Sequence, residues 1–217
     1  MLIKSSLKNI ELVDRIQFLQ ELCRGQRVLH LGATDAPLTQ AVVETGTFLH
    51  HHLEAVADHI VGIDLDESAI AWLRQTQNVN NIQLGDIEKL SDYPSAEFDV
   101  IVAGEIFEHL SSPGLALNCL RQIMRPQSQL VISVPNSYSL KGFLRAASGH
   151  EFIHPDHTLH HSPHTLKILL SRYGFEVKRY FSYINGGTGV FASIANQYLR
   201  YNPQLAEGIG VVCSLPD

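Results

Sequence analysis

The chain has 217 residues, of which 45% are hydrophobic and 18% are charged; this is typical of a folded domain and excludes a disordered chain. A formal net charge of −6 argues against a protein that binds nucleic acid through a broad basic surface. The three scattered cysteines argue against a disulfide framework, and no apolar run is long enough to cross a bilayer.

The N-terminal region, residues 1–25, is predicted to contain a helix. Apolar residues at helical spacing line one face of residues 7–23, and Gly25 follows as a stop. Residues 27–31 form a short apolar run that ends at Gly32, which predicts a buried strand entering a turn. A helix is expected to follow and to end near Asp58, with the run His50-His51-His52 on its surface.

Further along the chain, strands and helices alternate. The predicted strands are 59–64, 81–86, 98–103 and 129–134, and the predicted helices are 67–77 and 113–124. This alternation predicts an α/β fold in which a single Rossmann-like, doubly wound, mostly parallel sheet carries helices on both faces. We expect the whole chain, residues 1–217, to form a single domain.

Residues 137–162 are predicted to form an acceptor-site loop or lid, because they are rich in Ser, Gly, His and Pro and show weak periodicity. Ser162 and Pro163 predict the start of a helix that ends at Gly174. Residues 175–183 and 208–214 are predicted strands that close the sheet with an antiparallel edge strand.

The turn after the first predicted parallel strand is suited to a ligand. Gly32 permits a tight turn and a close approach to the backbone, while Ala33, Thr34 and Ala36 keep the neighbouring space open. The helix that follows would point its N-terminal amide groups at this position, which favours a carboxylate or a phosphate.

The next two strands each end in an aspartate. Asp64, followed by Leu65, can accept hydrogen bonds from both hydroxyls of a ribose. Asp86 can bond an adenine amino group while Ile87 packs on the ring. Because the carboxyl ends of parallel strands meet at one edge of the sheet, these residues and Gly32 together predict a site for an adenosine-type ligand.

The sequence resembles class I S-adenosylmethionine (SAM)-dependent methyltransferases, and is nearest to the bacterial type 11/12 enzymes. The segments that carry the resemblance are 28–34, 62–64, 85–87, 98–101 and 105–110. The resemblance implies SAM as the cofactor, bound through Gly32, Asp64, Asp86 and Ile87, with Ala33, Thr34, Leu65 and Glu105 in the same site. It also implies methyl transfer to a hydroxyl, an amine or a similar acceptor on a small metabolite, glycan or lipid intermediate.

Three positions depart from that family's usual pattern. The family usually has an acid where this chain has His30, and further glycines where it has Thr34 and Ala36. A SAM- or nucleoside-binding protein without catalysis is therefore an alternative. A nicotinamide-dependent oxidoreductase is disfavoured, because the loop lacks the G-x-G-x-x-G spacing.

Two histidines are candidates for the catalytic base. His109 follows the fourth strand, beside the expected position of the methyl group, and could deprotonate a hydroxyl acceptor or simply help to cap the loop. His157, in the predicted lid, is the second candidate and belongs to a run that also holds His154, His160, His161 and His164.

The spacing of Glu105, Glu108 and His109 resembles the metal-binding segment of small-RNA 2′-O-methyltransferases and of some ubiquinone-pathway O-methyltransferases. One more histidine from residues 150–157 would complete a divalent-ion site, which leaves a metal-assisted RNA 2′-O-methyltransferase as another alternative. Our expectation is no bound metal and no nucleic-acid partner. We also expect a cytoplasmic protein, since residues 1–6 do not resemble a signal peptide. The sequence neither predicts nor excludes a homodimer.

Overall fold

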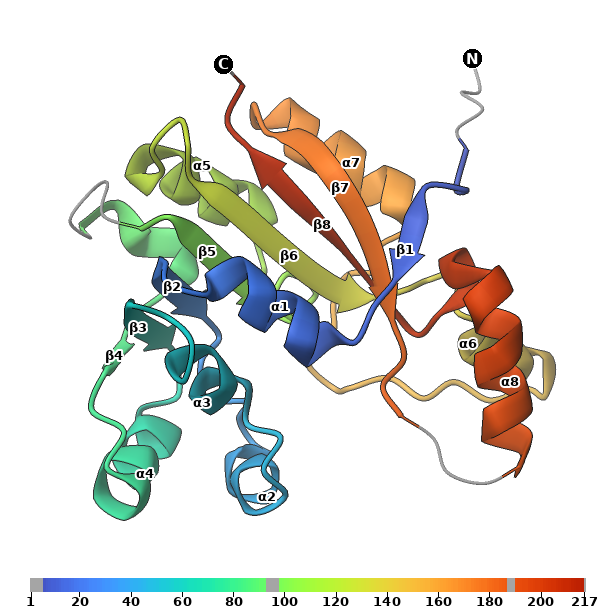
Figure 1. Cartoon of the computed structure of the whole chain (residues 1–217), viewed down its shortest axis with the longest axis horizontal. Helices are drawn as coiled ribbons and strands as arrows, with labels where there is room; N and C mark the ends of the chain where they lie inside the picture. The colour runs from blue at the N-terminus through green and yellow to red at the C-terminus, as the bar shows by residue number, and fades with distance from the viewer. Residues whose placement is uncertain (1–5, 93–97, 187–189, 217) are drawn as a thin grey trace.

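The computed structural model describes residues 6–92, 98–186 and 190–216 (Figure 1). Its eight strands form one sheet in the order β1-β7-β8-β6-β5-β2-β3-β4. The strands are β1 (Ile10–Leu12), β2 (Arg27–Leu31), β3 (His59–Asp64), β4 (Ile82–Leu84), β5 (Val100–Gly104), β6 (Gln129–Pro135), β7 (Glu176–Tyr183) and β8 (Gly208–Ser214).

The helices connect and cover these strands. They are α1 (Arg15–Cys23), α2 (Thr39–Glu44), α3 (Leu49–Glu54), α4 (Glu67–Gln77), α5 (Pro113–Ile123), α6 (Leu140–Ala147), α7 (Pro163–Arg172) and α8 (Val190–Tyr201), with 3₁₀ segments at Ile87–Asp92 and Pro203–Leu205. None of them, within the described residues, is long and apolar enough to cross a membrane.

The sheet is mostly parallel, as predicted. Strand β2 pairs in parallel with both β3 and β5, and β5 pairs in parallel with β6. Strand β8 is antiparallel to β6 and to β7. The antiparallel strand therefore lies inside the sheet rather than at its edge, because β7 and β1 continue the sheet beyond it.

The predicted N-terminal helix is partly wrong, because residues 10–12 form strand β1. This short strand pairs in parallel with β7, with Ile10 opposite Tyr180. Helix α1 starts only after Asp14, whose side chain accepts a hydrogen bond from Gln17 N (3.0 Å) and so caps the helix. The strand exists because β7 offers an open edge, which local periodicity cannot reveal.

The single helix predicted to end near Asp58 is also wrong, because two short helices, α2 and α3, occupy this stretch. Gly46 interrupts them with a φ of 70°, a conformation that glycine adopts at little cost. The turn brings α3 back against α1 and the sheet, where Leu49 and Leu53 are buried.

Side chains of alternate strand residues pack in two hydrophobic cores on opposite faces of the sheet. Ile101 of β5 and Ile132 of β6 pack in the core that α5 and α7 cover. Val102 of β5 and Val131 of β6 pack in the core that α1 and α3 cover. Figure 1 shows these helix pairs on opposite faces, which confirms the predicted doubly wound architecture.

The predicted lid, residues 137–162, contains one helix, α6, that the sequence analysis did not predict. Ser139 caps it by accepting a hydrogen bond from Gly142 N (3.1 Å), and none of its residues is buried. The rest of the lid is irregular and returns along the loop after β5, where Thr158 N donates to the carbonyl oxygen of Glu108 (2.9 Å). The lid is thus tied to the carboxyl end of the sheet.

Candidate active site

The carboxyl ends of β2, β3 and β4 form one continuous edge, here called the cofactor rim (residues 32–34, Asp64 and Asp86). Gly32 N donates to Ile63 O (2.9 Å), and Thr34 N donates to Asp64 Oδ2 (2.9 Å). On the other side, Gly85 N donates to Asp64 O (2.9 Å). The turn and the two aspartates predicted to meet are therefore neighbours.

The backbone at position 32 favours glycine. Its φ is 69°, and a Cβ atom there would lie 2.8 Å from Cδ1 of Ile106. The two residues that follow, Ala33 and Thr34, are fully buried, and the Thr34 hydroxyl has no hydrogen-bond partner among the described residues. The turn is thus tightly fixed against the loop after β5.

The carboxylate of Asp64 is held in place by the backbone. Its Oδ2 accepts from Thr34 N, and its Oδ1 accepts from Asp66 N (2.9 Å). A carboxylate oxygen has two lone pairs, so each oxygen can still accept one ribose hydroxyl. Leu65, the next residue in the predicted site, is 63% exposed and could cover a ligand at this position.

Asp86 is anchored in a similar way. It accepts a hydrogen bond from Glu88 N (2.9 Å) and pairs with Lys89 Nζ (2.9 Å), and the lysine contact lowers the pKa of the carboxyl. The neighbouring Ile87 packs its side chain in the core that α5 covers. Contact of Ile87 with an adenine ring therefore stays a prediction.

His30 and His50 form a buried pair behind the rim. Their Nδ1 atoms are 3.1 Å apart, and the rings stack with an interplanar angle of 12°. The expected surface position of His50 is wrong, because α3 packs this residue inward, where its Nε2 contacts Asn81 Oδ1 (3.2 Å). Burial lowers the pKa of His50 to about 4 and the pKa of His30 well below its usual range. Both imidazoles are neutral at pH 7.

Arg15, at the start of α1, belongs to the site although the sequence analysis missed it. A Cβ atom on Gly104 would lie 2.6 Å from its Nη2 atom, and its guanidinium lies 5.3 Å from the centre of the Tyr183 ring. The guanidinium Nε is buried and has no hydrogen-bond partner among the described residues. No local pattern marks Arg15, because only the folded chain brings α1 to the end of β5.

Two carboxylates lie near this arginine. Glu105 accepts a hydrogen bond from the buried Tyr183 hydroxyl, and Asp35 lies within electrostatic reach of Arg15, Asp64 and Glu105. Both Asp35 and Glu105 have a φ of 56°. One guanidinium and two carboxylates form a charge pattern that complements an amino-acid group, whose carboxylate and ammonium carry the opposite charges.

A cavity of about 770 Å³ opens beside Glu105, and we call it the acceptor cavity. Most of its wall comes from the predicted lid, including Lys141, Arg145 and Phe152, and the rest includes Asn185 and Glu207. The Arg145 guanidinium lies 4.6 Å from the centre of the Phe152 ring. Glu105 is thus shared between the charged group near Arg15 and the cavity.

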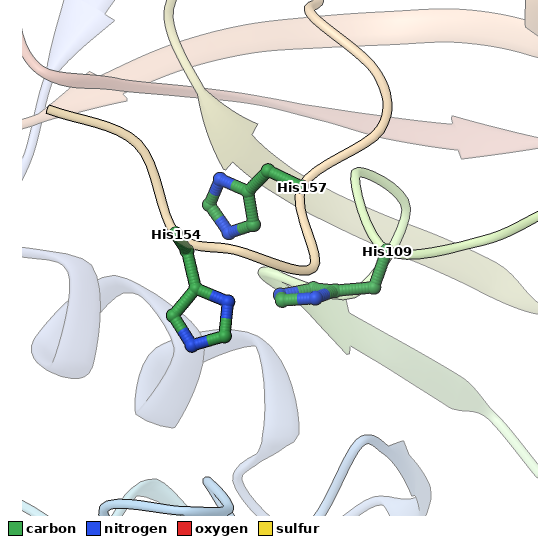
Figure 2. A group of neighbouring side chains, drawn as sticks. All are labelled: His109, His154 and His157. Carbon is green, nitrogen blue, oxygen red and sulfur yellow. The ribbon is translucent and has the colours of Figure 1, made fainter. Parts of the chain in front are cut away.

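Of the two predicted base candidates, His157 lines this cavity, and His109 packs against His157 and against His154, which also lines it (Figure 2). The rings of His109 and His157 are 4.5 Å apart, and His154 lies 5.4 Å from His109 and 5.3 Å from His157, all between ring centres. Burial and the nearby imidazoles lower the pKa values of His109 and His157. His161, in contrast, is buried away from this group and pairs its backbone with Ser137.

Glu108 lies directly behind the histidines. Its side chain is 1% exposed, and neither carboxylate oxygen has a hydrogen-bond partner among the described residues. His157 lies close to it, with 4.0 Å between Glu108 Oε1 and His157 Nε2. Burial, and secondarily the charge of Glu105, raises the pKa of this carboxyl to about 8.

Comparison with known proteins gives the family. Residues 9–180 match a family model described as a methyltransferase domain. The ubiquinone biosynthesis O-methyltransferase of Aromatoleum aromaticum is 26% identical over 133 residues, which are 59% of this chain and 52% of that protein. The chain thus matches about half the length of that curated relative.

Solved structures share the fold. The SAM-dependent methyltransferase from Archaeoglobus fulgidus is 21% identical with a TM-score of 0.57, and the match covers 92% of this chain and 91% of that one. A second, from Aquifex aeolicus, is 18% identical with a TM-score of 0.61, covering 97% and 94%. Because the family model covers most of its length, this chain belongs to the class I SAM-dependent methyltransferase family.

Proposed function

We propose that the protein transfers the methyl group of SAM to a hydroxyl group of a small molecule. The observation that carries this proposal is the continuous cofactor rim, in which Gly32, Thr34 and Asp64 are held together by backbone hydrogen bonds. Such a rim suits an adenosine ligand, because Asp64 keeps lone pairs for the ribose hydroxyls.

The charged groups beside the rim suit the methionine half of SAM. Arg15 would bind the carboxylate, while Asp35 and Glu105 would face the ammonium and the sulfonium. These carboxylates would supply the negative charge that an acid at position 30 supplies in the family pattern. His30 is engaged with His50 in the core, so this departure leaves the negative charge at the site intact.

The acceptor cavity would hold the second substrate. Glu105 lines the cavity and the charged group alike, which would place the methyl group at the boundary between them. When bound, SAM would supply a methyl group on a positively charged sulfur, and S-adenosylhomocysteine would be the leaving group when the acceptor oxygen takes the methyl. The hydroxyl proton passes to a base, for which His109 and His157 remain the predicted residues.

A hydroxyl acceptor is supported by the relatives, since several carry the name ubiquinone biosynthesis O-methyltransferase. The volume of about 770 Å³ is within the range of small-molecule sites. The net charge of −6 disfavours an RNA acceptor. A glycan or lipid intermediate, an amine acceptor and a non-catalytic SAM-binding protein are the alternatives that the experiment must separate.

Calorimetry with SAM, S-adenosylhomocysteine and NAD⁺ tests the cofactor. We expect both SAM compounds to bind with one site per chain and NAD⁺ to give no heat. Binding of NAD⁺ alone would overturn the proposal. Transfer of labelled methyl from SAM to a panel of phenols, catechols and matched amines then tests the reaction. Label on the amines alone would refute the hydroxyl acceptor, and SAM binding with no transfer to any member would favour the non-catalytic protein.

A further inference from the structure

Three imidazoles converge where the lid meets the loop after β5, and we call them the histidine cluster (His109, His154 and His157). Each offers a ring nitrogen, and these atoms all lie within 4.8 Å of one another. Figure 2 shows the rings grouped around a common space, with His154 and His157 on the lid and His109 on the facing loop. Residues from two separate segments thus share one small volume.

A buried carboxylate without partners backs the cluster. The Glu108 side chain is 1% exposed, its two oxygens lack hydrogen bonds among the described residues, and it lies 4.0 Å from His157. Burying a carboxylate without compensation is costly, and a neighbouring cation is the usual compensation. On the outer side, His154 Nδ1 accepts a hydrogen bond from Asp156 N (3.3 Å), which helps to fix the orientation of this imidazole.

We propose that His109, His154 and His157 bind one divalent transition-metal ion, with the Glu108 carboxylate compensating its charge. Three imidazoles favour an ion such as Zn²⁺ or Co²⁺ over Mg²⁺ or Ca²⁺, which prefer oxygen ligands. The site differs from the carboxylate-rich one that the sequence analysis left as an alternative, because two of its ligands come from the lid and Glu105 is engaged by Tyr183.

The geometry needs only a small closure. Nitrogens bound about 2.1 Å from a tetrahedral ion are about 3.4 Å apart. Since the ligand atoms now lie within 4.8 Å of one another, the largest separation must shrink by about 1.4 Å, which rotation of the partly exposed His154 side chain can supply. A bound ion would therefore also fasten the lid to the loop after β5.

This inference adds a metal ion to the proposed function. What it says about the acceptor rests on that proposed function. His154 and His157 line the acceptor cavity, so the open side of the ion would face the second substrate. A divalent ion lowers the pKa of a hydroxyl that it contacts, so the acceptor would release its proton to solvent, and His109 and His157 would then serve as ligands in place of the base role. The expected acceptors are oxygen nucleophiles with a second oxygen nearby, such as a catechol or a vicinal diol.

Titration with Co²⁺ tests the site without any turnover. Protein stripped with a chelator and dialysed should bind one Co²⁺ per chain, with visible absorption bands of a four- or five-coordinate nitrogen site, and Zn²⁺ should displace it. The variant with His154→Ala and His157→Ala should bind Co²⁺ at least about 100-fold more weakly. His160→Ala, on the same lid and also at the cavity wall, should keep the wild-type affinity.

Equal Co²⁺ affinity of wild type and the double variant, or an octahedral hexa-aqua spectrum, would overturn the proposal. Thermal melting of each variant establishes that it is folded, and both altered side chains are partly exposed on the lid. S-adenosylhomocysteine affinity, measured on the same samples, should be the same in all three proteins. Co²⁺ binding without S-adenosylhomocysteine binding would refute the proposed function alone, and the reverse result would refute the metal site alone. Transfer that survives chelation but is lost in His157→Ala would assign the base role instead.

Discussion

At the scale of single residues, the Asp64 carboxylate of the cofactor rim has a fixed orientation. Both of its oxygens already accept backbone hydrogen bonds, so the carboxylate points in a fixed direction before a ligand arrives. Fixed acceptors bind ligands more tightly, because less conformational freedom is lost on binding. The residue therefore contributes to affinity through its charge and through its fixed orientation.

Asp64→Ala should weaken binding of S-adenosylhomocysteine by about 1–3 kcal/mol, the usual loss for charge-assisted hydrogen bonds. Calorimetry measures this directly. Asp66→Ala is the matched control, because it removes the cap of α4, where Asp66 accepts from Ala69 N (2.8 Å), and leaves Asp64 in place. The control should lower the melting temperature and keep the affinity. Equal affinities of the Asp64 variant and the wild type would remove Asp64 from the site.

The buried histidine pair makes stability depend on pH. The unfolded chain holds His50 at a pKa of about 6.5, while burial lowers the pKa to about 4 in the folded protein. Between these values the unfolded state binds more protons, so the free energy of unfolding is highest above pH 6.5 and falls as the pH decreases. Going from pH 7.5 to 5.5, this one group should remove about 1 kcal/mol.

Urea unfolding of the wild type and of His50→Gln at pH 7.5 and 5.5 measures the effect. The variant should lose about 1 kcal/mol less than the wild type over this interval, whatever its stability at pH 7.5. His51, which lies on the same helix and is only partly buried, provides His51→Gln as a control with the wild-type dependence. Parallel pH dependences of the wild type and His50→Gln would show that His50 is not buried in neutral form.

At the scale of elements, the sequence was informative where capping residues or glycine and proline bounded a periodic segment. The predicted strand 59–64 and helix 67–77 coincide with β3 and α4, and helix 113–124 differs from α5 by one residue. Strand β1 was missed, because three residues carry no periodicity and need β7 as a partner. Helix α6 was missed, because it buries no residue and lies in a Ser- and Gly-rich stretch.

The same distinction separates the parts of the site. Gly32, Asp64 and Asp86 were predictable, because each directly follows a recognisable strand and parallel strands end at one edge. Arg15 and Tyr183 were not, because they reach the site from opposite ends of the chain. The meeting of His109 with His154 and His157 depends on how the lid folds back, which no local pattern contains.

One side chain holds the start of the lid to the C-terminal segment. Asn136 is 5% exposed, and its amide donates to Gln204 O (2.9 Å) and Ala206 O (2.7 Å) and accepts from Tyr138 N (3.0 Å). Asn136→Ala should lower the free energy of unfolding by about 2–3 kcal/mol, because it leaves buried groups without partners. Denaturant unfolding measures the loss.

Ser139→Ala is the control for this element. It removes the cap of the exposed helix α6 and should cost about 0.5–1 kcal/mol locally, with little effect on global unfolding. A loss at Asn136 no larger than the loss at Ser139 would mean that the amide contacts do not fasten the lid.

At the scale of the whole molecule, cofactor binding should stabilise the fold, because the rim exists only in the folded chain and a ligand that binds it does not bind the unfolded chain. A ligand at 100 times its dissociation constant adds about 2.7 kcal/mol to the free energy of unfolding, which for a chain of this size is a shift of about 5–10 °C in melting temperature. Thermal melts with and without S-adenosylhomocysteine measure this shift, and NAD⁺ serves as the control. The Asp64→Ala variant should show a clearly smaller shift, and an equal one would contradict the proposed site.

Strand β8 makes room for the side chain that positions Glu105. A Cβ atom on Gly208 would collide with the ring of Tyr183, so the ring lies flat across β8 in the space that glycine leaves. That ring carries the hydroxyl that holds Glu105. A side chain at position 208 would therefore displace the Tyr183 ring and, with it, the hydroxyl that holds Glu105, so a residue outside the cofactor rim controls the position of a charged group beside it.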